Sequence, residues 1–545
     1  MTIAFPPRAA RSFILAVAVV FLFGASVHHS QELGQERTLY DNPIYRWRES
    51  LAVALSRMQD KPLHGYLAYR STRDYLAQHG LGLMGGEADP LPSGQERHDL
   101  VFDPDRMEEL IREARDAPID YTLPPVMVQG NELGVADYYY WSFKLFGLNL
   151  RALWLFYFSL LAVSAGLFFL TFRRSPFCIL LLMLYLSAHY YMVGYAALPH
   201  FTTVHNSRFF PVLSILPAMH LMLLLVRRER ATLLTATVAG IQTLLLMFII
   251  FCRLEAAWQA MAVIFAAGLM VSLRPIWRAL RHPRTQRAGA WRTLMDVWPA
   301  TLCAAGVILM TAYGWVAVDK QYRNATRTHV FWHTAFAGLV SSSPELDKLY
   351  GQGQDEYGDN IAYMAALTYL REHRDVKSAI AYTGSDGQLY INPMSNMGAY
   401  DKVMRRVFIG VVAHHPWLVL KSFLVDKPRD QIDFLKNKGV FRLGGDAVPL
   451  ALAAAASLLT LMAGASLPTK SELLLGLRTV TLVGAFSLVT PMIVPSLLIV
   501  GTIVFFLMIA LLLGVTAPVA LVWHGIARLL RAWAGRPRGT VSSAP

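Results

Sequence analysis

Hydrophobic and polar positions are grouped in long blocks along this chain. An apolar span at 12–28 is followed by a mostly polar stretch, and apolar segments then run from 151 to 318. A second polar stretch separates these from a last apolar group at 448–523. Runs of about 20 apolar residues can cross the roughly 30 Å hydrocarbon core of a bilayer. The pattern therefore predicts an all-α polytopic membrane protein with two large polar blocks.

We predict about ten membrane-spanning helices from runs of sufficient length. They lie at 12–28, 151–172, 176–197, 209–226, 231–252, 255–273, 296–318, 447–465, 476–494 and 496–523. Only Pro491 to Pro495 separates the last two, so this part of the chain crosses either twice or once. The predicted units are an N-terminal span at 1–28, a first outward loop at 29–150, six spans at 151–318, a second outward domain at 319–446, and C-terminal spans with a basic tail at 447–545.

The composition and the placement of charge agree with a membrane protein. Hydrophobic residues make up 54% of the chain and charged residues 16%, with a mean hydropathy of +0.38, and a soluble domain could not bury so much apolar surface. The net charge of +13 comes with arginines concentrated in short loops, which is the positive-inside pattern. No nucleic-acid partner is needed to explain it. We expect both termini in the cytoplasm and both polar blocks on the outer side of a bacterial inner membrane.

Three further features of the sequence argue against particular sites or classes of protein. Cys178, Cys252 and Cys303 are far apart in apolar segments, so neither a disulfide framework nor a thiolate metal site is indicated. The first span resembles a signal peptide in its basic start and apolar run, but no clear A-x-A cleavage site follows it. No Walker-type loop is present, which argues against ATP-driven transport within the chain.

The first polar block has recognisable local patterns. Apolar residues Leu51, Val53, Leu55 and Met58 favour an amphipathic helix lying on the membrane surface. The segment 80–94 is typical of a loop, and 105–117 of a short charged helix that begins after Pro104. The block ends in an aromatic-rich approach to the membrane at 137–147, which is also typical of an interfacial aromatic belt.

Histidines and buried polar residues supply further candidates. His329 and His333 are spaced four apart, a spacing that can bind metal, but no H-E-x-x-H pattern accompanies them. Hydrogen-bonded or substrate-contacting histidines fit better, so no metal site is predicted there. His220 and Glu255 are polar residues in or beside apolar spans, where such residues are either functional or hold helices together by hydrogen bonds.

The run from Tyr138 to Arg174, YYYWSFKLFGLNLRALWLFYFSLLAVSAGLFFLTFRR, resembles the junction between the first outward loop and the second span of GT-C glycosyltransferases. An aromatic approach leads into a K-L-F-G turn and then into a long Leu-rich span that ends in basic residues. The wider layout, a seven-span module with a long first outward loop, is also similar. The resemblance implies a GT-C-like fold and the transfer of a sugar from a polyprenyl-phosphate carrier to an envelope glycan, lipid or protein.

The resemblance also implies an acidic base early in the first outward loop. Asp41, in D-N-P-I-Y, is the best positional match, and the alternatives are Glu32, Glu36, Glu132 and Asp137. Asn42 stands where the family has D-E or D-x-D, which leaves open both the identity of the base and a divalent cation as cofactor. The remaining candidates are basic and aromatic residues: Arg46, Arg48, His200, His205 and Arg208 for the carrier phosphate, and His329, Trp332 and His333 for the acceptor.

Each candidate role has a chemical reason and a structural alternative. A carboxylate is needed to take the proton of the attacking hydroxyl, and cationic donors are needed where the leaving phosphate gathers charge. Arg suits bidentate phosphate contact. Asp41 is, however, also a good helix-initiating residue. The arginines at 46, 48 and 208 are equally suited to anchoring in lipid headgroups.

The sequence leaves three classes of function. The leading hypothesis is an inverting glycosyltransferase that uses a polyprenyl-phosphate-linked sugar. The second is an envelope glycan polymerase or ligase that works through outward Arg and His residues without a carboxylate base. The third is a lipid or glycan translocase, or an assembly scaffold, which the few polar residues in the spans and the lack of internal repeats disfavour.

Overall fold

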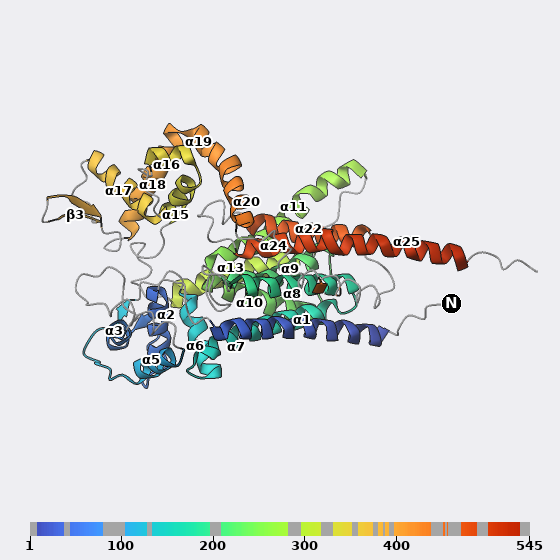
Figure 1. Ribbon diagram of the computed structural model, residues 1–545, viewed down its shortest axis with the longest axis horizontal. Helices are drawn as coiled ribbons and strands as arrows, with labels where there is room; N and C mark the ends of the chain where they lie inside the picture. The colour runs from blue at the N-terminus through green and yellow to red at the C-terminus, as the bar shows by residue number, and fades with distance from the viewer. Residues whose placement is uncertain are drawn as a thin grey trace, which may run out of the picture.

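The apolar segments fold as helices that run side by side along the long axis of the molecule (Figure 1). In Figure 1 both polar blocks lie at one end of this bundle, and the beginning of α1 and the end of α25 lie at the other. The computed structural model describes residues 8–36, 44–79, 104–127, 133–196, 209–281, 296–317, 331–350, 358–373, 380–384, 387–391, 397–437, 451–452, 455, 470–487 and 500–534. A helical, multi-pass membrane protein is therefore confirmed.

The bundle is built from helices of both apolar groups. Its members are α1 (Arg8–Glu36), α7 (Leu150–Phe172), α8 (Pro176–Ala196), α9 (Phe210–Val226), α10 (Leu233–Cys252), α11 (Ala257–Arg281), α13 (Trp298–Ala317), α22 (Lys470–Ser487), α24 (Val500–Leu511) and α25 (Ala517–Ala534). The short 3₁₀ helix η2 (Leu254–Ala256) joins α10 to α11, and the π-helical turn η6 (Leu512–Thr516) joins α24 to α25. The C-terminal helices α22 and α24 pack on α8 and α9, so the two apolar groups form one bundle.

The number of candidate spans is lower than the sequence predicts. Among the described residues six helices are long and apolar enough to cross a membrane, or seven if the bent pair Gly398–His414 and Pro416–Asp430 counts as one span. Two predicted spans fold as shorter apolar helices, Phe210–Val226 and Trp298–Gly314. The prediction at 447–465 falls almost entirely outside the described residues. The prediction at 476–494 overlaps α22, which begins at Lys470 and is not among the helices long and apolar enough to cross a membrane. Its last part, 488–494, lies outside the described residues.

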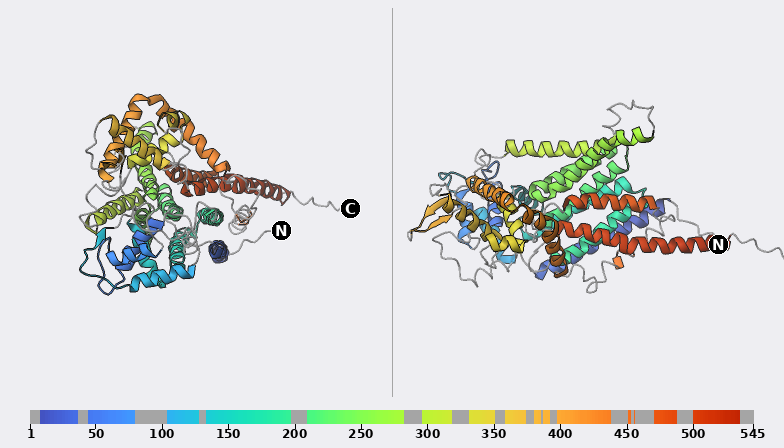
Figure 2. Two further views of the ribbon diagram at one scale, coloured as in Figure 1. Left: turned by 60° about the vertical axis from the view of Figure 1, so that its left-hand side comes forward. Right: turned by 90° about the horizontal axis from the view of Figure 1, so that it is seen from above.

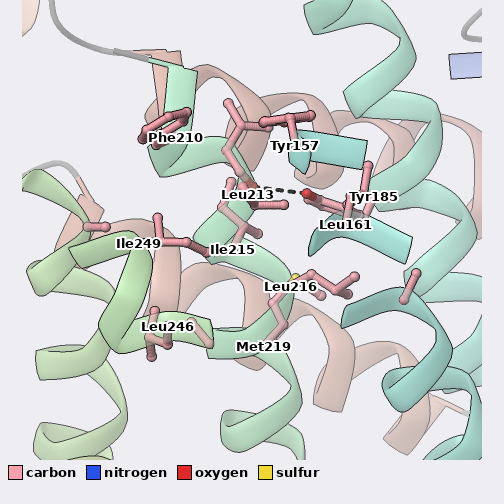
Figure 3. Packing of buried hydrophobic residues seen from close by; sticks show 14 of the residues in the cluster. Tyr157, Leu161, Tyr185, Phe210, Leu213, Ile215, Leu216, Met219, Leu246 and Ile249 are labelled. Carbon is pink, nitrogen blue, oxygen red and sulfur yellow. Dashed lines mark hydrogen bonds between the residues drawn. The ribbon is translucent and has the colours of Figure 1, made fainter. Parts of the chain in front are cut away.

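Helix α9 lies at the centre of the bundle (Figure 3). Every residue from Phe210 to Leu225 is buried. Leu213, Ile215 and Leu216 lie among side chains of α7, α8 and α10 in Figure 3, and the Tyr185 hydroxyl of α8 donates to the Val212 carbonyl at 2.9 Å. Helix α9 is therefore enclosed by other helices and has little surface left to contact lipid.

The first polar block packs directly on the bundle. It contains α2 (Ile44–Ser56), β1 (Leu67–Ala68), α3 (Arg70–Gln78), α5 (Pro104–Asp116), β2 (Val126–Met127) and α6 (Gly134–Phe146). The charged helix after Pro104 is confirmed as α5, whose Glu108 accepts a hydrogen bond from the Leu150 backbone N–H at the start of α7 at 3.0 Å. The predicted loop at 80–94 lies outside the described residues.

Helix α2 corrects the expectation of a surface-lying amphipathic helix. The residues from Ser50 to Ser56 are all buried, so both sides of this part of the helix are covered. The helix packs against α3, α5, α6 and β1. The helix itself is confirmed. The small residues Ala52 and Ala54, which lie between the larger apolar residues, are also buried against protein, and the spacing of the larger residues did not indicate this.

The second polar block has a hydrophobic core of its own. It contains α15 (Phe331–Ser341), α16 (Pro344–Tyr350), α17 (Gly358–Glu372), β3 (Ala381–Thr383), β4 (Leu389–Ile391), α18 (Met397–His414), α19 (Pro416–Lys421), the π-helical turn η4 (Ser422–Asp426) and α20 (Lys427–Asn437). Phe336, Leu339, Leu370 and Met404 are among the side chains of this core, which is separate from the core of the bundle. The block is thus an independently packed unit.

The prediction of an all-α fold is wrong in one detail. Strands β1 and β2 pair antiparallel in the first block, with Leu67 opposite Met127. Strands β3 and β4 form an antiparallel pair in the second block, with Tyr382 opposite Tyr390. Each strand has only two or three residues, too few for a period-two pattern to be recognised.

Candidate functional site

A buried ionic cluster lies where the first polar block meets the bundle. Its centre is Asp137, in the first turn of α6. The Arg57 guanidinium, just after α2, donates from Nη1 to Asp137 Oδ1 at 2.5 Å, and the Tyr66 hydroxyl donates to Oδ2 at 2.6 Å. The Arg57 Nε and Nη2 groups also donate to the Gly65 carbonyl, at 2.9 and 2.5 Å. The cluster therefore fixes the segment after α2 to the start of α6.

The electrostatics of the cluster favour a charged pair beside a neutral tyrosine. Burial lowers the pKa of the Arg57 guanidinium, but the charge and hydrogen bond of Asp137 raise it, as does Tyr66, and the net change in the pKa is upward. Burial raises the pKa of the Tyr66 hydroxyl, and the Asp137 carboxylate raises it further. The Arg57 guanidinium also lies over the Tyr66 ring, 4.6 Å from its centroid. Tyr66 accordingly remains protonated and Arg57 remains charged at neutral pH.

A close helix contact holds this cluster against the bundle. A Cβ added to Gly134 would lie 2.4 Å from the Phe251 carbonyl carbon, so only glycine lets α6 approach the end of α10 this closely. The Cys252 thiol donates to the Gly134 carbonyl at 3.1 Å. The Phe251 ring contacts the rings of both Tyr66 and Tyr313, which brings α13 into the same assembly.

Asp137 is the one predicted base alternative whose side chain the structure describes. Both of its carboxylate oxygens already accept hydrogen bonds, from Arg57 and from Tyr66. Taking a proton from a substrate would neutralise the carboxylate and leave the largely buried Arg57 guanidinium without its counter-charge, which is costly. This geometry suits Asp137 better to positioning the first polar block than to general-base catalysis.

The other predicted residues of the donor site are described only in part. Glu32 and Glu36 lie in the last turns of α1, and Arg46 and Arg48 lie in the first turns of α2. Asp41, between these two helices in the chain, lies outside the described residues. So do Glu132, His200, His205, Arg208 and His329. Their predicted roles stay predictions.

Trp332 and His333, two of the three predicted acceptor residues, lie in the first turn of α15. The His333 ring is buried, and its Nδ1 and the Tyr400 hydroxyl are hydrogen-bonded at 2.6 Å. The Trp332 backbone N–H donates to Asp401 Oδ1 at 3.0 Å, and its ring lies near the Arg405 guanidinium and the Phe408 ring. His333 is thus part of the packing between α15 and α18, whereas Trp332 is only partly buried.

Hydrogen bonding inside the bundle accounts for His220. Its Nδ1 and the Gln242 amide nitrogen are hydrogen-bonded at 3.0 Å, and the same nitrogen donates to the Ser164 carbonyl at 2.8 Å. Because the three residues belong to α9, α10 and α7, the network holds three helices together. This is the second of the two roles that the sequence leaves open for His220. Glu255 forms an ion pair with the buried Arg253 at the turn between α10 and α11.

Sequence reasoning missed Arg57 and Tyr66. They are 80 and 71 residues from Asp137 in the chain, and neither belongs to a motif of recognisable spacing. Within the described ranges no group of three or more His, Cys, Asp or Glu side chains is arranged to hold a metal ion.

The chain matches no protein-family model, no curated protein sequence and no solved structure. The function is therefore inferred from this chain's own residues and layout.

Proposed function

We propose that the protein is an inverting glycosyltransferase that moves a sugar from a polyprenyl-phosphate carrier to a cell-envelope acceptor on the outer side of the membrane. The observation that carries the proposal is the gathering of both polar blocks at one end of the helix bundle (Figure 1). An enzyme that acts on a lipid-linked substrate needs folded parts at the membrane surface, beside the bilayer that holds the carrier chain.

In this proposal Asp41 acts as the general base. Its carboxylate takes the proton of the acceptor hydroxyl as the hydroxyl oxygen attacks the anomeric carbon. The bond between that carbon and the phosphate oxygen breaks in the same displacement, so the configuration inverts and polyprenyl phosphate leaves. The end of α1 and the start of α2 would flank the base, and Arg57 and Asp137 act as positioning residues that hold the end of α2 to α6.

Cationic side chains would stabilise the leaving phosphate. Arg46 and Arg48 follow Asp41 within the first turns of α2, and His200, His205 and Arg208 precede α9 in the chain. Charge-assisted hydrogen bonds from such groups are strongest where little water is present. Trp332 in the second block is suited to stack on an acceptor sugar ring.

The test uses the full-length protein in nanodiscs with a panel of radiolabelled polyprenyl-phosphate sugars and an envelope extract as the source of acceptor. We expect wild type to release label from one donor and Asp41→Ala to lose that activity. Asp60→Ala, an exposed carboxylate in the same block, is the matched control and should retain it.

The other outcomes separate the competing functions. Release that survives Asp41→Ala would move the base to Glu32, Glu36, Glu132 or Asp137, or would favour a polymerase or ligase without a carboxylate base. No release from any donor with a folded protein would contradict the proposal. Movement of intact carrier across the bilayer without release would support a translocase.

A further inference from the structure

The second polar block carries an apolar face that its own core does not cover. Trp417, Leu420 and Leu424 follow one another at spacings of three and four along α19 and η4, so they lie on one side of the helix. Trp417 is 71% exposed and Leu424 is 67% exposed, and Val425 beside them is also exposed. Large apolar side chains that gather on one exposed face indicate a contact with a partner or a membrane.

The opposite side of the same helix faces the block. Val419 is buried in the core of the second block, and the buried Ser422 hydroxyl donates to the Leu339 carbonyl of α15 at 3.2 Å. Lys421 lies beside the apolar face, and its ammonium group forms an ion pair with Glu345 of α16. The segment is thus held to the block from one side, so its apolar face has a fixed direction.

The path of the chain places this segment beside the bundle at its outward end. The helices Gly398–His414 and Pro416–Asp430 are together apolar enough for a span, but they bend by 100° at His415. In Figure 1 α19 lies to the side of the bundle, and α20 leads from it toward the outward ends of α22 and α24. Lipid headgroups surround a membrane bundle at this level.

The composition of the segment fits that location. Trp is enriched at membrane interfaces, where its ring bridges apolar and polar surroundings. The Arg429 side chain, one turn beyond η4, is 83% exposed and lies 3.8 Å from the exposed Asp433 carboxylate, a weak surface pair that leaves most of the guanidinium open to lipid phosphate. The apolar side chains enter the boundary with the acyl chains.

We propose that the face formed by Trp417, Leu420, Leu424 and Val425 docks the second polar block onto the outer leaflet of the membrane beside the bundle. The bent segment then acts as an interfacial anchor that keeps the block at the bilayer surface. This inference does not depend on the proposed enzymatic function.

The test uses single cysteines in the full-length protein, with one protein per nanodisc. Cys178, Cys252 and Cys303 are buried, so a fluorescent thiol reagent will label introduced exposed cysteines selectively. We would label Leu420→Cys and Leu424→Cys separately and measure quenching by nitroxide-bearing lipids and by aqueous iodide. Tyr382→Cys, on the exposed face of β3 at the far end of the block, is the matched control.

The labels at 420 and 424 are expected to be quenched several-fold more by nitroxide lipid than the label at 382, and to be protected from iodide. The label at 382 should show the reverse. Strong iodide quenching at 420 and 424 without lipid quenching would overturn the proposal, because the face would then lie in water. Protection from both quenchers would also overturn it, because protein would then cover the face.

Discussion

The contacts of Asp137 favour a structural role over the catalytic role that the sequence offered as an alternative. As a carboxylate at the end of the first outward loop it was an alternative base, but Arg57 and Tyr66 occupy both of its oxygens. His220 and His333 are similar, since each is hydrogen-bonded in a packed interior. The role of a buried polar side chain thus depends on which neighbouring groups form hydrogen bonds or ion pairs with it.

Removing the positive partner of Asp137 should destabilise the protein strongly. Arg57→Met leaves the Asp137 carboxylate buried with only Tyr66 as donor, and losing one partner of a buried pair typically costs about 3–5 kcal/mol. Thermal unfolding can be followed with a thiol-reactive dye, because the three native cysteines are buried and react only when the fold opens.

The control for this experiment is Arg112→Met. Arg112 pairs with Glu108 on the exposed side of α5, where an ion pair is worth about 0–1 kcal/mol. The double variant Arg57→Met/Asp137→Leu should recover part of the loss, since no unpaired charge then remains. Equal unfolding temperatures for Arg57→Met and Arg112→Met would show that the cluster does not stabilise the fold.

The helix pair α6 and α7 shows how an element boundary is encoded locally. Gly147 ends α6 with a φ of 91°, and its backbone N–H donates to the Phe143 carbonyl at 2.9 Å. The Asn149 side chain then accepts from the Ala152 backbone N–H at 2.8 Å and caps α7. The K-L-F-G segment therefore ends α6 in a turn, with glycine at the position that requires a positive φ.

Two glycine substitutions in this helix pair should have opposite effects. Gly147→Ala forces a side chain into a backbone conformation that only glycine adopts readily, which we expect to cost about 1–3 kcal/mol. Gly166→Ala, inside α7 with open space around the added Cβ, should stabilise by about 0.5–1 kcal/mol. The same thermal unfolding measurement distinguishes them. A loss at Gly166 equal to that at Gly147 would contradict the conformational explanation.

For the whole molecule, the placement of both polar blocks at one end of the bundle is the main result of the fold. The blocks are separated in the chain by the helices from α7 to α13, yet Figure 1 and Figure 2 show them together. The turns that carry Arg173, Arg174 and Arg227 join the same helices at the opposite end. This arrangement agrees with the positive-inside expectation for the loops, and the side of the membrane can be tested directly.

A topology measurement follows from this arrangement. Cysteines introduced at exposed positions Asp60, in the first block, and Lys402, in the second, should react with a membrane-impermeant maleimide in intact spheroplasts. A cysteine at Arg230, in the turn between α9 and α10, should react only after the membrane is opened. Labelling at 230 together with 60 or 402 in intact spheroplasts would contradict the topology.

Local patterns in the sequence predict the membrane class, the approximate positions of most long helices and the charged helix α5. These depend on hydropathy and capping within a few neighbouring residues, which a single chain displays directly. The sequence of the spans did not show that α9 is enclosed by other helices or that α2 is buried on both sides, since burial depends on what packs against an element.

Packing between elements that are distant in the chain brings Asp137 to Arg57 and makes His220 a link between three helices. It also leaves Trp417 and Leu424 on an uncovered face. Arg57 and Asp137 are 80 residues apart, and the exposed face depends on how α19 is held to α15 and α16. Such contacts join segments that are distant along the chain. Their energies arise from desolvation and packing between elements, which leave no pattern of spacing in the sequence.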